Sequence, residues 1–342
     1  MSASLPTSVV GSHARPGWFV SGLSAAERGE FGPVDLRELY DDAVDVALRD
    51  QEHAGVDVVS DGEMRRAGFF TAEFYRHLTG VEAVPADRRL GAGGHDQQHR
   101  FAVSAPIAAP DGLGVVDEFR YAVTRTSRPL KVTIPGPYTL SGRLRTGPGE
   151  VYDARDAAAE AFVPILRDEL VALVEAGATI IQIDDPSPAI HPDAPSDFAA
   201  LFNAAVAPIV GKVRLGAHLC FGNYEGRPLA RRTYRPVFDA MLAFRVDELV
   251  LEFANRELAE LDVLADITAA GMDVAAGLID VKSYHLETAD EVAGRIDAVL
   301  ATGVPAERLT IVPDCGFSQT ARWATVAKLR AMVAGRDLVL GR

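Results

Sequence analysis

The sequence contains only two cysteines, and each follows a short apolar run that ends in polar residues. Cys220 stands two residues after His218 in RLGAHLC, and Cys315 ends the run LTIVPDC. Positions i and i+2 of a strand point to the same side, so this imidazole and thiol can reach one metal ion. Glu252, which follows the run ELVL, adds a carboxylate. These ligand types favour zinc over magnesium or calcium, although buried free cysteines are also common as inert core residues.

The predicted ligand set determines the chemistry that we expect from such a zinc site. Zinc held by two thiolates and an imidazole is electron-rich and therefore a weak Lewis acid. Its expected task is to bind a thiol and lower the pKa of that thiol, because the thiolate is the nucleophile in sulfur chemistry. A displaceable Glu252 would leave room for the substrate sulfur. The sequence therefore predicts alkyl transfer to a thiol, not hydrolysis.

The candidate ligands belong to a wider pattern in which a short apolar run precedes a helical stretch. The eight strand-like runs are Ser8–Ser12, Val56–Glu63, Lys131–Pro137, Thr179–Pro186, Arg214–Cys220, Glu248–Ala254, Asp273–Asp280 and Leu309–Gly316. Nearly continuous apolar runs are typical of parallel strands that are buried on both faces. Helical patterns between them include Arg37–Glu52, Ala154–Glu175 and Ala289–Ala301. The alternation predicts a (β/α)8 TIM barrel in a single domain spanning 1–342, with a doubly wound open sheet as the alternative.

The carboxyl ends of the strands converge on one face of such a barrel, where active sites lie. Seven of the eight runs carry a residue capable of chemistry at or near that end. One such residue could simply cap the next helix, but seven form a pattern that indicates a site.

One stretch, 84–129, does not follow the alternation. It contains a glycine-rich segment, several prolines and an alternating piece at Glu118–Val123. We interpret it as an insertion between the second and third βα units, with a hairpin and a loop. Such an insertion could cap the site or be a peripheral decoration.

Composition excludes several classes of protein. The 342 residues include 48 acidic and 34 basic side chains, which gives a formal charge of −14. An acidic surface repels phosphate backbones and anionic lipid, so we expect neither nucleic acid nor a membrane as partner. The N-terminus has no charged segment followed by an apolar segment, and two cysteines cannot form a disulfide framework. Both observations favour a cytoplasmic location.

The motifs together resemble the catalytic C-terminal domain of cobalamin-independent methionine synthase, in its single-barrel core form. The resembling segments, from Val9 to Phe317, are VVGSHARP, DVVSDGEMRR, KVTIPGPYTL, IQIDDPSPAI, HLCFGNYEG, LVLEFANRE, GLIDVKS and IVPDCGF. The resemblance implies a (β/α)8 barrel that methylates homocysteine. It also implies zinc on the four residues named above, His218, Cys220, Glu252 and Cys315.

The resemblance further implies an amino-acid site. Gly11 and Ser12 would hold the substrate carboxylate, Glu63 would bind its ammonium group, and Asp184 would assist. The charges suit these roles, because a buried ammonium group needs carboxylate partners and a carboxylate needs N–H donors. His13 follows the Gly-Ser pair, where the family usually has an apolar or aromatic residue, and we include it among the substrate-binding candidates.

The sequence departs from the family near the expected chemistry. Where the family has a catalytic histidine in D-x-H-S, this chain has Asp280 and then Lys282, with His285 three residues further on. We take these three as candidates for supplying a proton to the leaving group. The chain is also too short for the second barrel of the full-length enzyme, which helps to bind methylfolate.

These departures leave both substrates open. The donor could be a methylfolate or a methyl-corrinoid protein. One alternative is a coenzyme M-type transferase that opens an epoxide with a zinc-bound thiol. Another is a metal-free barrel enzyme similar to uroporphyrinogen decarboxylase, for which Arg65 and Arg66 could line a polycarboxylate cavity.

Overall fold

The computed structural model describes residues 5–66, 73–84, 100–190, 197–223, 228 and 231–342. Six parallel strands form a sheet in chain order, which is the order that right-handed strand–helix–strand units produce. They are β3 (Lys131–Pro135), β4 (Ile180–Asp184), β5 (Arg214–Leu219), β6 (Glu248–Glu252), β7 (Asp273–Ile279) and β8 (Leu309–Pro313). All six predicted runs from Lys131 onward therefore contain a strand.

Two very short segments close this sheet into a ring. Thr7 pairs in parallel with Ile311 of β8, Ser8 with Val58, and Val59 with Leu130 beside β3. Backbone hydrogen bonds support each step, among them Ser8 N–H to Ile311 O at 2.9 Å and Val58 N–H to Thr7 O at 3.0 Å. The predicted (β/α)8 barrel is confirmed, and the open doubly wound sheet is wrong because both edges of the sheet are paired.

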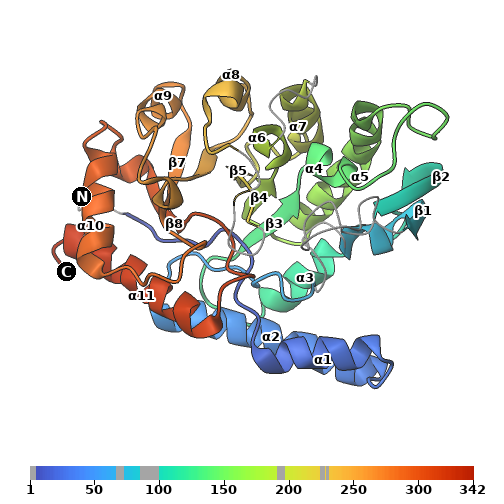
Figure 1. Ribbon diagram of the computed structural model, residues 1–342, viewed down its shortest axis with the longest axis horizontal. Coiled ribbons are helices and arrows are strands. Elements are labelled where there is room, and N and C mark those ends of the chain that lie inside the picture. The colour runs from blue at the N-terminus through green and yellow to red at the C-terminus, as the bar shows by residue number, and fades with distance from the viewer. Residues whose placement is uncertain (1–4, 67–72, 85–99, 191–196, 224–227, 229–230) are drawn as a thin grey trace.

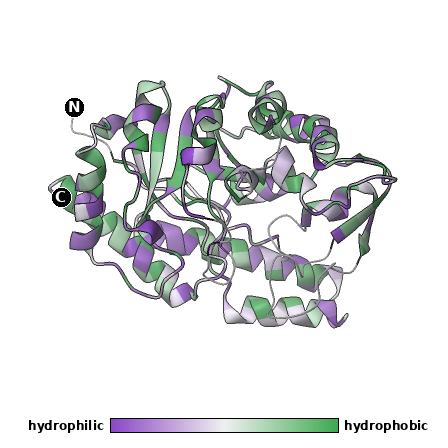
Figure 2. Ribbon diagram, turned by 45° about the horizontal axis from the view of Figure 1, so that its top comes forward, coloured by the Kyte–Doolittle hydropathy of each residue, from purple (hydrophilic) through white to green (hydrophobic). Residues whose placement is uncertain are grey.

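Helices surround the ring, with both chain ends at the left in Figure 1. The longer ones are α1 (Gly17–Glu27), α2 (Pro33–Ala54), α5 (Arg155–Glu175), α7 (Phe198–Val206), α9 (Val263–Ala269), α10 (Ala289–Leu300) and α11 (Arg322–Val339). Helix α2 ends at Gly55, whose φ of 87° is the left-handed conformation that glycine adopts readily. Figure 2 shows the strands as mainly hydrophobic and the helices as two-sided, as expected for strands covered by amphipathic helices.

Shorter elements lie in the loops. They are α4 (Pro137–Ser141), α6 (Ser187–Ile190), α8 (Phe238–Leu242), η1 (Glu73–His77), η3 (Arg235–Val237), η4 (Ala254–Arg256) and η5 (Ala306–Arg308). Helices α4 and η4 directly follow β3 and β6, so they lie at the carboxyl ends of the strands, where the candidate site is found.

An antiparallel hairpin lies between the second and third barrel strands. Its strands are β1 (Thr79–Val84) and β2 (Arg100–Ala108), which project at the right edge of Figure 1. Residues 85–99 of the expected insertion lie outside the described part. The alternating piece Glu118–Val123 is not a strand, because most of it belongs to α3 (Val115–Ala122), which buries Val115, Phe119 and Ala122 at helical spacing.

The strand residues that face the inside of the barrel are unusually polar. Alternation places Glu248, Val250 and Glu252 of β6 on the inner side, while Leu249 and Leu251 join the outer core. Lys131, Thr133, Gln182, His218 and Thr310 are also buried polar strand residues. A purely structural barrel would fill these layers with branched apolar side chains, so the polarity points to function.

No helix in the described part of the chain is long and apolar enough to span a membrane.

Candidate metal centre

Three of the four predicted zinc ligands meet at the carboxyl ends of the strands. The nearest ligand atoms of His218, Cys220 and Cys315 all lie within 4.8 Å of one another. His218 is on β5, Cys220 follows the end of β5, and Cys315 follows β8. The two sulfur atoms are 3.9 Å apart and both cysteines are free thiols. Barrel closure thus brings together residues that are 95 positions apart in the chain.

The donor set fits a tetrahedral zinc ion. Two thiolates at about 2.3 Å from zinc are separated by roughly 3.8 Å in a tetrahedral site, which is close to the observed sulfur distance. The Nε2 atom of His218 is buried and has no hydrogen-bond partner among the described residues. The Oε1 atom of Glu252 is likewise buried without a partner in the part of the chain that the structure describes, and this side chain is fully buried at the end of β6. Unpartnered buried polar atoms are costly, so they mark positions where a ligand is expected.

Asp184 fixes the orientation of the histidine. Its Oδ1 atom lies 2.9 Å from His218 Nδ1, across the β4–β5 register in which the two residues are paired. Gln182 donates to the same oxygen at 2.7 Å, and Lys131 donates to Gln182 at 2.8 Å. A carboxylate on Nδ1 leaves Nε2 available as the metal ligand. The structure therefore places Asp184, which we expected at the substrate, against a predicted metal ligand.

Charges within the cluster shift its pKa values. Burial lowers the pKa of His218, but the hydrogen bond to Asp184 and the Cys315 thiolate raise it to about 10 overall. The hydrogen bond from Cys220, together with His218 and despite burial, lowers the pKa of Cys315 well below its usual range. The same hydrogen bond and burial raise the pKa of Cys220. The Cys315 thiol is therefore the more acidic of the two, and a metal bound here would release the protons that the cluster still holds.

Lys282 pairs directly with the fourth predicted ligand. Its Nζ atom lies 2.6 Å from Glu252 Oε2, and only 5% of the lysine side chain is exposed. Burial raises the pKa of Glu252, with the Cys315 thiolate adding to this rise and Lys282 opposing it. Asp280 acts on the backbone, because its Oδ1 accepts from Lys282 N–H at 2.8 Å. The loop after β7 therefore presents an ammonium group to the cluster.

Asp314 ties the ends of three strands together. It precedes Cys315, and its carboxylate accepts backbone N–H groups of Phe253, Ala254 and Asn255 at 2.7–2.9 Å. Its own N–H donates to Ile279 O at 2.9 Å. A Cβ atom at Gly277 would lie 2.7 Å from Asp314 Oδ1, so only glycine allows this approach. The turns that carry Glu252 and Cys315 are thereby held in fixed relation.

The predicted amino-acid subsite lies at the ends of the first two strands. A Cβ atom at Gly11 would lie 2.5 Å from Glu63 Oε1, and one at Gly316 would collide with Ser12 Oγ. Gly11 and Glu63 therefore meet, and Ser12 lies beside the turn that follows Cys315. Burial raises the pKa of Glu63 to about 7 against the opposing effect of Arg66. Glu63 also accepts a hydrogen bond from Thr133 at 2.7 Å.

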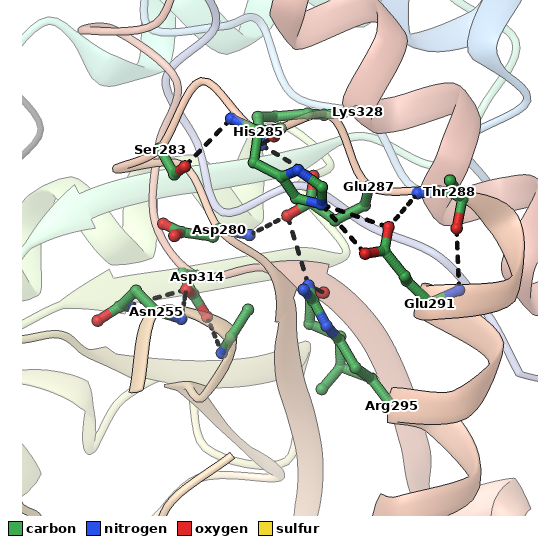
Figure 3. A network of polar contacts seen from close by, with 12 residues as sticks. Asn255, Asp280, Ser283, His285, Glu287, Thr288, Glu291, Arg295, Asp314 and Lys328 are labelled. Atoms are coloured by element: carbon green, nitrogen blue, oxygen red, sulfur yellow. Dashed lines mark hydrogen bonds and ion pairs between the residues drawn. The ribbon is translucent and has the colours of Figure 1, made fainter. Parts of the chain in front are cut away.

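Two histidine candidates face other partners. The Nε2 atom of buried His13 lies 3.1 Å from Asp50 Oδ2 on α2. The side chain of His285 is 58% exposed, and its Nε2 lies 3.1 Å from Glu291 on α10, as Figure 3 shows. The structure does not bring either imidazole into the cysteine cluster, and their predicted roles stay untested.

The structure gives roles to polar residues that the sequence reasoning left out or considered only for another function. Arg66, which we considered only for a polycarboxylate cavity, donates to Thr133 O and pairs with Glu118 at 2.8 Å. It also lies 3.4 Å from Glu63. Lys131 and Gln182 orient Asp184 from the barrel interior. A signal was present, because each of these last two interrupts an otherwise apolar strand. A polar residue inside such a run costs free energy unless it is partnered.

The closed barrel and the largely buried His-Cys-Cys cluster at its carboxyl end define a (β/α)8 enzyme with a candidate thiolate metal centre. Residues 5–336 match the family model described as cobalamin-independent synthase, catalytic domain. The chain belongs to the cobalamin-independent methionine synthase family, whose members are methyltransferases.

Relatives support the assignment over nearly the whole chain. Methionine synthase of Thermococcus kodakarensis is 34% identical over 336 residues, covering 98% of this chain and 93% of the relative. Methionine synthase of Sulfurisphaera tokodaii is 32% identical over 338 residues. A solved structure of a B12-independent methionine synthase from Shewanella sp. W3-18-1, in complex with selenomethionine, matches with a TM-score of 0.82. The two sequences are 29% identical, and the match covers 98% of this chain and 97% of the Shewanella chain.

Proposed function

We propose that this chain transfers a methyl group to the thiol of homocysteine, forming methionine, with zinc bound by His218, Cys220, Glu252 and Cys315. The observation that carries the proposal is the convergence of one imidazole nitrogen and two sulfurs within 4.8 Å at the carboxyl end of the barrel. The methionine synthases to which the chain is similar support homocysteine as the acceptor.

Zinc bound in such a site lowers the pKa of a coordinated thiol, which makes it nucleophilic at neutral pH. The residues of the chain hold the ligands in place and orient the amino acid. Asp184 holds His218 in the tautomer that presents Nε2, and Glu252 offers the ligand that a substrate sulfur can replace. Gly11, Ser12 and Glu63 are proposed to bind the carboxylate and ammonium groups of the amino acid, which would orient its sulfur toward the cysteines.

The protein would be purified without added metal and assayed for zinc as wild type, Cys220→Ser, Cys315→Ser and His218→Gln. His53→Gln is the matched control, because His53 is exposed on α2. We expect about one zinc per chain in the wild type and control, and none in the three site variants. Wild-type protein that folds and holds no zinc under reducing conditions would contradict the proposal.

The acceptor and the donor need separate assays. Homocysteine and coenzyme M would be compared for zinc-dependent proton release on binding, and we expect release with homocysteine. Methionine formation would then be followed with a methylfolate and with a methyl-corrinoid as donors. Release with coenzyme M alone, followed by epoxide opening, would favour the coenzyme M-type alternative.

A further inference from the structure

The chain has only four lysines against thirty arginines, so lysine is the unusual cation in this protein and a buried lysine stands out. Lys282 lies beside the cysteine cluster with its Nζ 2.6 Å from Glu252 Oε2. The other oxygen of the same carboxylate, Oε1, is buried and accepts no hydrogen bond from any residue that the structure describes. One oxygen of this carboxylate is thus paired with a cation of the chain, and the other is left available for a ligand.

The surroundings of Lys282 show that it belongs to the cluster. Burial lowers the pKa of Lys282, but the negative groups around it, Glu252, Cys315, Asp314 and Cys220, raise it overall. A zinc ion with two thiolates, a carboxylate and a neutral imidazole would have a net charge of −1. If a third thiolate replaced the carboxylate, the displaced carboxylate would stay buried, and without Lys282 no cation would compensate its charge. A buried charge of this kind costs several kcal/mol unless it is paired.

We infer that Lys282 is a positioning residue that receives the Glu252 carboxylate when the substrate thiolate takes its place at the metal. Lys282 holds Oε2 throughout, so that only Oε1 is offered to the metal. When the thiol binds, its proton leaves to solvent, the sulfur takes the ligand position, and Glu252 remains paired with the ammonium group. This inference rests on the proposed function and adds a specific partner for the displaced ligand.

The loop that carries Lys282 is built to keep the ammonium group in place. Asp280 Oδ1 accepts from Lys282 N–H at 2.8 Å, and Thr320 donates to Val281 O at 3.1 Å. Buried Glu287 accepts from Asp280 N–H at 2.9 Å, as Figure 3 shows. A flexible loop would lose the pairing each time the lysine changed rotamer, and side-chain entropy would favour that loss.

The test uses the zinc-loaded full chain as wild type, Lys282→Met, Lys282→Gln and Lys282→Arg, with exposed Lys212→Met as the matched control. Zinc content, homocysteine affinity with proton release, and the sulfur and oxygen ligands counted by X-ray absorption would be measured. We expect one zinc in every variant. Homocysteine affinity should fall about 100-fold in Lys282→Met, recover largely in Lys282→Arg, and be unchanged in Lys212→Met.

Each outcome addresses either the inference or the function on which it rests. Wild-type thiol affinity in both Lys282→Met and Lys282→Gln would overturn the inference. So would zinc loss in Lys282→Met as complete as in Cys315→Ser, or an oxygen ligand that stays on zinc in the wild-type homocysteine complex. This last measurement needs no variant and therefore does not depend on variant folding. Absence of zinc or of thiol binding in the wild type would instead refute the proposed function.

Discussion

Two buried lysine–glutamate pairs lie in this barrel, and they differ in what surrounds them. Lys328 of α11 pairs with Glu287 at 2.8 Å, and both side chains are fully buried. Glu287 also accepts from Asp280 N–H, while Lys328 donates to the carbonyl of His285. Lys282 and Glu252 pair at 2.6 Å, but Glu252 Oε1 has no partner within the described ranges. The first pair is a closed network and the second has an open position.

The difference teaches how function can be told from stability among buried charges. Desolvation makes a buried ion pair costly unless its remaining hydrogen-bond positions are filled. The Lys328–Glu287 pair meets that condition with groups of its own chain, so its expected contribution is to hold the loop after β7. The Lys282–Glu252 pair does not meet that condition within the described part of the chain, and we propose a metal ion as the partner of the remaining Glu252 oxygen.

Lys328→Met gives the largest effect that the comparison predicts. It leaves the Glu287 carboxylate without its ammonium partner, and we expect the free energy of unfolding to fall by about 3–5 kcal/mol. The zinc content of the folded fraction should stay near one per chain. Urea unfolding followed by circular dichroism, with zinc analysis of the native protein, measures both quantities.

Lys282→Met is the matched substitution in the open pair. In zinc-loaded protein the metal compensates Glu252, so the loss of unfolding free energy should be clearly smaller than in Lys328→Met. Equal losses in the two variants would show that both pairs are structural and would remove the distinction.

Asp184→Asn tests the open site at its histidine. An amide on His218 Nδ1 orients the ring less firmly and does not raise its basicity, so zinc affinity should fall about 10–100-fold. Competition with a chromogenic chelator measures this affinity. Asp185→Asn is the control on the same strand end, because the Asp185 carboxylate accepts from Thr139 Oγ1 and not from the histidine. A loss in Asp185→Asn that matches Asp184→Asn would rule out a specific role for Asp184.

The alternation of apolar runs with helical stretches allowed the fold to be predicted, and candidate ligands followed from the rule that alternate residues of a strand share a face. His218 and Cys220 followed from that rule, and Cys315 and Glu252 from their places at strand ends. The pairing of Asp184 with His218 could not be predicted from the sequence. The two residues are 34 positions apart, and their contact depends on the register between β4 and β5. Lys282 was chosen as a proton donor, but its partner depends on the turn that Asp280 forms.

Sequence periodicity was also insufficient for the shortest segments. Six residues at Glu118–Val123 fit alternation, yet three residues that are buried together in α3 lie at helical spacing. The first two barrel strands are reduced to isolated bridges, and residue propensities do not predict how short such strands are. Tertiary pairing decides such segments.

The smallest effect is expected at a third charged cluster, formed by buried Asp50 and His13 and partly exposed Arg322. Burial raises the pKa of Asp50, but hydrogen bonds from His13 and Arg322 lower it to about 2, from an ordinary value of 3.8. A carboxyl group whose pKa is lowered on folding stabilises the fold at pH values above its unfolded pKa. This contribution is lost as the pH falls through the folded pKa of about 2. Because Arg322 is partly exposed, we expect Asp50→Asn to cost only about 1–2 kcal/mol at pH 7 and to have less effect at pH 3.

Urea unfolding of wild type and Asp50→Asn at both pH values measures this difference, and it also tests the assignment of His13. His13 Nε2 and both Asp50 oxygens are partnered within the chain, so this cluster resembles the closed pair and not the open one. Zinc content and homocysteine affinity should therefore match the wild type in Asp50→Asn. A change in thiol affinity without loss of stability would instead place His13 at the substrate, because the imidazole would then be oriented by Asp50 for binding and not for packing.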